Sequence, residues 1–227
     1  MGSSPSFLDP VVLPLIRGKH ILDVACGFGR WGCLMRTNFF EWGLNEFPIV
    51  DGIDGDKECV EHCRELGVYR EVKHALLPIP MPPRSYDTVL ASEVIEHFSK
   101  DEIISFLDHC EKTARYRVII TTPNFVCIRG GSYSPLGFNE LDHHQCYVSQ
   151  DYLKQRGYKI LGAGFNASRV LWMKCILRLM QLLRINSYSC FLGLSLNIPA
   201  LAHTTIAYKV ISPFPDKIIT HAGFNTD

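Results

Sequence analysis

A glycine-rich segment early in the chain carries residues suited to binding a small ligand. It reads Asp23-Val-Ala-Cys-Gly27-Phe-Gly29-Arg-Trp-Gly32 and begins within a short apolar run at 20–25. Glycines at a strand-to-helix turn let the backbone bend sharply and approach a ligand closely. A second acid, Asp54, follows the next apolar run at 49–53. The pattern predicts a binding loop with a carboxylate on the neighbouring strand.

Two kinds of ligand fit this loop. Gly27, Gly29 and Gly32 match a dinucleotide fingerprint, and Asp54 lies about twenty residues further on, where NAD proteins hold a ribose. Asp23 lies in the strand itself, with its carboxylate toward the turn. A pyrophosphate there would be repelled, whereas an ammonium group would be attracted. S-adenosylmethionine carries an ammonium and a sulfonium and no phosphate, so Asp23 favours this cofactor over NAD.

Strand-like and helix-like segments alternate along the first half of the chain, which indicates βαβ units and a parallel sheet. We expect a single domain over 1–227, with a seven-stranded, mostly parallel sheet, helices on both faces and an apolar helical insert before the last strand. The expected strands are 20–25, 49–53, 71–75, 86–92, 117–122, 158–165 and 203–212; the expected helices are 30–39, 57–66, 101–113 and 149–156; a long loop at 123–147 and the insert at about 166–202 complete the chain.

Four segments in register resemble the class I S-adenosylmethionine-dependent methyltransferases, which have a Rossmann-like α/β fold. The segment 23–32 resembles motif I, Gly52-Ile-Asp54 the end of the second strand, 86–97 motif IV and its following turn, and 120–124 the end of the fifth strand. The resemblance implies a transferase, and it places the cofactor at these strand ends. The cofactor contacts that it implies are Asp23, Ala25, Cys26, Gly27, Gly29, Asp54, Gly55, Ala75, Leu76, Ser92 and Glu93.

One position departs from the pattern of these methyltransferases. Relatives often place an acid after the third strand to hold the adenine amine, whereas this chain reads Lys73-His74-Ala75-Leu76 there. We therefore expect backbone groups and packing on Ala75 and Leu76 to hold the adenine.

Acidic and imidazole side chains follow the expected fourth strand and recur downstream. Glu93, Glu96 and His97 share one face if their turn is helical, and Asp142-His143-His144 follows later. The Glu-x-x-Glu-His turn with a downstream histidine resembles ubiquinone-biosynthesis O-methyltransferases and also small-RNA 3′-end 2′-O-methyltransferases, in which these positions hold a metal.

Three roles remain open for this group. Glu93, Glu96, His97 and His143 could bind Mg²⁺ or a similar divalent metal. Alternatively, His143 or His144 acts as a general base, with Glu96 and His97 beside it as further catalytic residues. The third role is structural, a brace for the active-site loop.

The insert and the charge balance bear on the acceptor. The stretch at 170–185 reads VLWMKCILRLMQLLRI and predicts an amphipathic helix, either a cap or protein contact or a peripheral membrane contact. Lys plus Arg and Asp plus Glu are both 23, which argues against nucleic acid as a partner. We expect methyl transfer to an oxygen, or less favourably a nitrogen, of a small, lipophilic molecule. The alternatives are an RNA 2′-O-methyltransferase with a metal-assisted site and a non-catalytic, cofactor-binding partner subunit.

The cysteines and the start of the chain bear on the compartment. Nine cysteines without a CxxC pair indicate reduced thiols. The first residues lack the pattern of a signal peptide. A cytoplasmic protein, with or without peripheral membrane contact, is therefore expected, and no oligomeric state is predicted.

Overall fold

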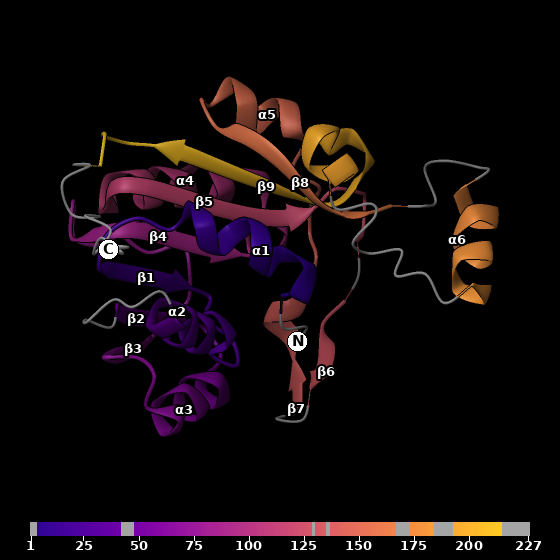
Figure 1. Ribbon diagram of the computed structural model, residues 1–227. Helices are drawn as coiled ribbons and strands as arrows, with labels where there is room; N and C mark the ends of the chain where they lie inside the picture. Colours follow the sequence, from indigo (N-terminus) through magenta and orange to yellow (C-terminus); the bar gives the residue numbers. More distant parts are fainter. Residues whose placement is uncertain are drawn as a thin grey trace, which may run out of the picture.

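The computed structural model describes residues 4–41, 48–128, 130–134, 137–166, 173–183 and 193–214. A seven-stranded sheet forms the centre of this part of the chain (Figure 1). Its strands are β1 (His20–Val24), β2 (Ile49–Asp54), β3 (Glu71–His74), β4 (Tyr86–Ser92), β5 (Ala114–Pro123), β8 (Lys159–Phe165) and β9 (Ala202–Val210). Their order is β3-β2-β1-β4-β5-β9-β8, and β9 runs antiparallel to both of its neighbours while β1 to β5 are parallel. The expected seven-stranded, mostly parallel sheet is confirmed.

Helices cover both faces of this sheet, as expected. One face carries α1 (Asp9–Val12), α2 (Arg30–Glu41) and α3 (Lys57–Leu66), and the other carries α4 (Lys100–Thr113) and α5 (Gln150–Gln155). Alternate strand residues pack on opposite sides. Ile21 and Leu90 join the α2 side, while Leu22 and Val89 join the α4 side. Both sets are buried, which explains why these strands read as continuous apolar runs.

Side-chain caps fix where the helices begin. Asp56 accepts hydrogen bonds from the backbone N–H groups of the first turn of α3. Ser99 and Glu102 form a reciprocal capping box at the start of α4. Ser149 caps α5, where its side chain accepts the Tyr152 N–H. These caps therefore define the residue at which each of these helices begins.

The segment 123–147 is not wholly the loop that the sequence suggests. It contains a short hairpin of β6 (Ser132–Ser134) and β7 (Gly137–Asn139), followed by a 3₁₀ turn, η4 (Glu140–Asp142). Tyr133 pairs with Phe138 across the hairpin, with ring centroids 5.0 Å apart. Strands of three residues are too short to show the alternation that marks a strand in sequence.

The amino-terminal segment is also more structured than its sequence indicates. Two 3₁₀ turns, η1 (Ser6–Leu8) and η2 (Leu13–Leu15), flank α1. Leu8 and Val12 are fully buried against the α2 side of the sheet. These elements are too short to be recognised from periodicity.

The insert contains the expected helix in part, as α6 (Met173–Leu182). The rest of the predicted helix at 170–185 lies largely outside the described residues. Figure 1 shows α6 away from the sheet, and Leu179 and Leu182 are exposed on it. Among the described residues, no helix combines the length and hydrophobicity needed to cross a membrane.

Candidate active site

A cleft lies at the carboxyl ends of β1, β2 and β4. Between β1 and β4 the strand order reverses, and ligands of open α/β sheets bind at such a point. The cleft has a volume of about 390 Å³, within the range of small-molecule sites. Its lining comes from the strand ends, the amino-terminal segment and the segment after β7: Ser4, Ala25–Phe28, Arg30, Trp31, Asp54, Gly55, Leu76, Leu77, Ser92–Val94, His97, Phe98, Glu102, Asn139–His143 and Gln145.

Asp54 anchors the glycine-rich loop. Its Oδ2 accepts the Gly27 N–H at 2.7 Å, and its Oδ1 accepts the Asp56 N–H at 2.8 Å. Burial raises the pKa of this carboxyl, and the backbone N–H groups oppose the rise. A carboxylate has about four acceptor sites, so acceptor capacity remains for a donor from a ligand. Asp54 can therefore bind the loop and the hydroxyl groups of a ligand at the same time.

Two non-glycine residues with positive φ mark the ends of adjacent strands. Ala25 follows β1 and Glu93 follows β4, and each has a φ of 57°. This left-handed conformation is uncommon outside glycine and concentrates at functional sites. The main chain therefore turns sharply at both strand ends that border the cleft.

Most of the predicted cofactor residues line this cleft: Ala25, Cys26, Gly27, Asp54, Gly55, Leu76, Ser92 and Glu93. Asp23, Gly29 and Ala75 are not among the lining residues. Ala75 donates its N–H to the Asp54 carbonyl instead. The predicted contacts of these three residues with a cofactor stay predictions.

Asp23 lies beneath the loop. Its side chain is 1% exposed, and its Oδ2 accepts the Tyr69 hydroxyl at 2.7 Å. Burial raises the pKa of Asp23 to about 7. Its Oδ1 has no hydrogen-bond partner within the described part of the chain.

The amino-terminal segment contributes cleft residues that sequence reasoning missed. The Ser4 Oγ lies 2.9 Å from the Ser92 Oγ and accepts the Trp31 indole N–H at 3.2 Å. Arg30, also in the lining, forms an ion pair with Asp9 at 2.6 Å. Ser4 and Ser92 are 88 positions apart, so no local pattern could have marked Ser4.

Residues after the β6–β7 hairpin cover the cleft from the other side. Leu141 packs close to Gly55 and Leu76, since a Cβ at Gly55 would lie 2.9 Å from Leu141 and 3.2 Å from Leu76. Leu76 and Leu141 are nevertheless exposed on their outer sides. An apolar edge therefore borders the cleft next to Asp54.

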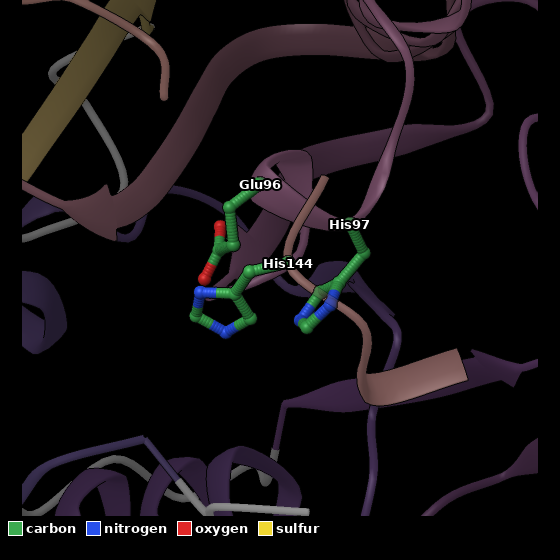
Figure 2. A group of neighbouring side chains, drawn as sticks. All are labelled: Glu96, His97 and His144. Carbon is green, nitrogen blue, oxygen red and sulfur yellow. The ribbon is translucent and has the colours of Figure 1, made fainter. Parts of the chain in front are cut away.

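Glu96, His97 and His144 form a cluster beside the cleft (Figure 2). One ligand atom from each lies within 4.8 Å of the others. Glu96 and His97 come from the turn η3 (Ile95–His97), and His144 comes from the segment after η4. His144, rather than the predicted His143, brings the second imidazole: the side chain of His143 is exposed and lines the cleft. Glu93 also lines the cleft and is not in the cluster.

The cluster is buried and polar. Glu96 is 2% exposed; its Oε2 accepts the Thr122 hydroxyl, and its Oε1 has no hydrogen-bond partner among the described residues. Burial, followed by the charge of Glu93, raises the pKa of Glu96 well above its usual value. The His97 Nδ1 lies 3.2 Å from the His143 carbonyl. A backbone carbonyl at that distance favours a proton on Nδ1, and the Nε2 faces the Asp142 carboxylate at 3.7 Å.

The arrangement divides the predicted catalytic residues into two groups. His97 and His143 line the cleft and can reach a ligand there, whereas Glu96 and His144 are buried behind it. One carboxylate and two imidazoles are a ligand set for a divalent transition metal. The orphaned Glu96 Oε1 fits such a role, because a buried acceptor without a partner is costly.

Comparison with known proteins finds sequence similarity to methyltransferases. A protein-family model described as a methyltransferase domain matches residues 21–116. A probable S-adenosylmethionine-dependent methyltransferase of Mycolicibacterium smegmatis is 27% identical over 52% of this chain and 44% of its own length. A sphingolipid C9-methyltransferase of Candida albicans is 25% identical over 43% of this chain and 20% of its own length. The chain thus spans less than half the length of these curated relatives.

A solved structure supports the fold over most of the chain. An S-adenosylmethionine-dependent methyltransferase from Mesorhizobium loti superimposes with a TM-score of 0.53 and 12% identity, over 90% of this chain and 98% of that one. Identity this low bears on the fold alone. Residues 21–116 are therefore similar in sequence to methyltransferase domains, and the chain has the Rossmann-like class I methyltransferase fold over most of its length.

Proposed function

We propose that this protein is an S-adenosylmethionine-dependent methyltransferase that methylates an oxygen of a small, lipophilic molecule. One observation carries the cofactor assignment. The Asp54 carboxylate pins the Gly27 N–H within a cleft formed by the ends of three adjacent strands. A ribose bound to Asp54 would leave the methionine part of the cofactor beside the loop at Gly27 and the adenine beside Leu76.

The charge of the site supports this cofactor over a dinucleotide. Asp23 and Asp54 lie below and beside the glycine-rich loop, and the charge of Asp54 adds to the pKa rise of Asp23. Two carboxyl groups near one loop repel a pyrophosphate and attract an ammonium or sulfonium. The match of residues 21–116 to methyltransferase domains agrees with this assignment.

His143 is the candidate base. Methyl transfer from a sulfonium is an in-line displacement, so the protein mainly aligns donor and acceptor. A hydroxyl acceptor must also lose its proton, and an imidazole at the cleft can accept it. His143 lines the cleft, and no hydrogen bond from its exposed ring restricts it within the described residues.

We further propose that Glu96, His97 and His144 hold a divalent metal. When bound, the metal would lower the pKa of a hydroxyl acceptor as a Lewis acid. Asp142, 3.7 Å from the His97 Nε2, adds a further negative charge near the cluster. Metal-assisted methylation of an RNA 2′-hydroxyl is the second candidate function, and this cluster is the observation that favours it.

Apolar side chains favour a lipophilic acceptor over RNA. Leu76 and Leu141 border the cleft, and Tyr133 and Phe138 are exposed on the hairpin that precedes Leu141. The equal numbers of basic and acidic residues provide no general attraction for a polyanion. The name of the Candida albicans relative indicates a lipid acceptor for that protein. The exposed leucines of α6 lie apart from this surface, and we propose that they contact a membrane or a partner protein.

Calorimetric titration with S-adenosylhomocysteine, and with NAD for comparison, tests the cofactor assignment. We expect S-adenosylhomocysteine to bind with a micromolar Kd and NAD not to bind. Binding of NAD alone would refute the assignment. Transfer of labelled methyl groups to an alkyl-tailed phenol, its tail-less analogue and a short RNA then tests the acceptor. Transfer to the RNA alone would favour the second candidate.

The two adjacent histidines offer a matched test of the metal and base assignments. His144→Ala should abolish binding of Mn²⁺ measured by calorimetry, because it removes one of three ligands. His143→Ala should leave Mn²⁺ binding intact and lower turnover about 100-fold, a usual contribution of a general base. Equal Mn²⁺ affinity in both variants and the wild type would contradict the metal site.

A further inference from the structure

Tyr69 is a buried side chain beneath the glycine-rich loop and lies outside the cleft. It is 9% exposed and belongs to the connection between α3 and β3. Its hydroxyl donates to the Asp23 Oδ2 at 2.7 Å and accepts the Gly32 N–H at 3.2 Å. The hydroxyl thus joins a buried carboxyl group to the first turn of α2.

The Gly32 N–H needs an acceptor from outside its own helix. The first internal bond of α2 runs from the Cys33 N–H to the Gly29 carbonyl. The N–H groups before Cys33 have no carbonyl partner within the helix. Tyr69 therefore acts as a helix cap from 37 positions away.

Three glycines make room for the Tyr69 ring. A Cβ at Gly32 would lie 2.5 Å from the Tyr69 Cζ, and Cβ atoms at Gly29 and Gly52 would lie 3.2 and 3.4 Å from its ring. Real Cβ atoms almost never approach to 2.5 Å, so a side chain at Gly32 would displace the ring. Gly29 and Gly32 do not line the cleft. Their place in the apparent dinucleotide fingerprint is thus explained by a buried tyrosine.

The hydrogen bonds around Tyr69 are directional. The hydroxyl has one proton, which goes to Asp23, so its oxygen accepts from Gly32. A carboxylate acceptor polarises the hydroxyl and strengthens the bond from the N–H group. The negative charge of Asp23 is also favourable near the amino end of α2. With Asp54 holding Gly27, the loop is fixed at both of its ends.

We propose that Tyr69 is a positioning residue for the cofactor: by joining Asp23 to the start of α2, it holds the glycine-rich loop in the conformation that binds S-adenosylmethionine. This inference rests on the proposed function. It assigns a role to a residue outside the cleft and to the third glycine of the loop.

Tyr69→Phe tests the proposal, with Tyr158→Phe as a matched control. Tyr158 is also a buried tyrosine, and its hydroxyl donates to Glu111 on α4, away from the loop. Tyr69→Phe should weaken the binding of S-adenosylhomocysteine about tenfold, the effect of one lost hydrogen bond to a charged group. Tyr158→Phe should leave the affinity unchanged. Equal affinity of Tyr69→Phe and the wild type would overturn the proposal.

A double-mutant cycle separates positioning from a general loss of stability. Combined with Asp23→Asn, Tyr69→Phe should have a smaller effect on affinity than it has alone, because the two side chains act through one hydrogen bond. With Tyr158→Phe the effects should add. Additive effects in both cycles would contradict the link between Tyr69 and Asp23.

Hydrogen exchange in the wild-type protein needs no variant. The Gly32 amide should exchange slowly because it donates to Tyr69, and fast exchange at this amide would overturn the proposal. Failure of the wild type to bind S-adenosylhomocysteine would refute the proposed function instead. Normal binding by the wild type and by Tyr69→Phe alike would refute only the role of Tyr69.

Discussion

Replacement of Asp54 by Asn should weaken the binding of S-adenosylhomocysteine about 100-fold. The Asp54 carboxylate accepts two backbone N–H groups, from Gly27 at 2.7 Å and Asp56 at 2.8 Å. Asn keeps one acceptor oxygen and turns an amide NH₂ toward the other donor. Loss of one charge-assisted bond to the loop and one to the ribose costs about 2–3 kcal/mol, which corresponds to about 100-fold in Kd.

Asp87→Asn is the matched control for Asp54→Asn. Asp87 is also 7% exposed, and its Oδ2 accepts the Lys19 and His20 N–H groups at 2.9 and 3.0 Å. It lies at the start of β4, at the edge of the sheet opposite the cleft. Calorimetry should show normal affinity for Asp87→Asn, and thermal unfolding should show a similar loss of stability in both variants. Equal losses of affinity would refute the ribose role of Asp54.

Two further predictions concern charge and packing. The affinity for S-adenosylhomocysteine should rise about eightfold between pH 6 and pH 7.5. Burial raises the pKa of Asp23 to about 7. The ionised fraction of this carboxyl group, which attracts the ammonium, therefore grows from about a tenth to about three quarters over that range. Tyr69, Cys26 and Asp54 are the titratable groups that face Asp23. Burial also raises the pKa of Glu93, which lines the cleft, to about 7. Asp23→Asn should therefore reduce the rise with pH, and a flat wild-type profile would exclude Asp23 as the ammonium partner. Leu153 is the buried residue of α5 and packs in the core. Leu153→Ala should lower the free energy of unfolding by about 2–5 kcal/mol and leave the Kd unchanged at 15 °C. A weakened Kd in the folded variant would show that α5 also shapes the cleft.

The parallel half of the sheet could be predicted from sequence because each of its strands forms its own recognisable apolar run. Residues such as Leu22 and Val89 alternate with equally buried neighbours, which produces short apolar runs between amphipathic helices. The β6–β7 hairpin and the amino-terminal turns could not be predicted in this way. Their elements are three or four residues long, and tertiary contacts determine their conformation.

The candidate site could be predicted where its residues follow one another along the chain. Gly27, Asp54 and Glu93 stand at the ends of recognisable strands, and they line one cleft in the structure. The choice between His143 and His144 depends on how the chain turns after η4, which sequence spacing does not specify. Tyr69 likewise contacts Gly32 only because α3 and β3 return the chain beneath the loop.

The position of β9 has a consequence for the growing chain on the ribosome. β9 lies between β5 and β8, and it is the neighbour through which β8 joins the sheet. Until residues 202–210 leave the exit tunnel, β8 has no strand to pair with and the edge of β5 stays open. Unpaired strand edges of this kind promote aggregation. The nascent protein should therefore depend most on chaperones in the interval between the synthesis of β8 and that of β9, and slower translation there should lower its soluble yield.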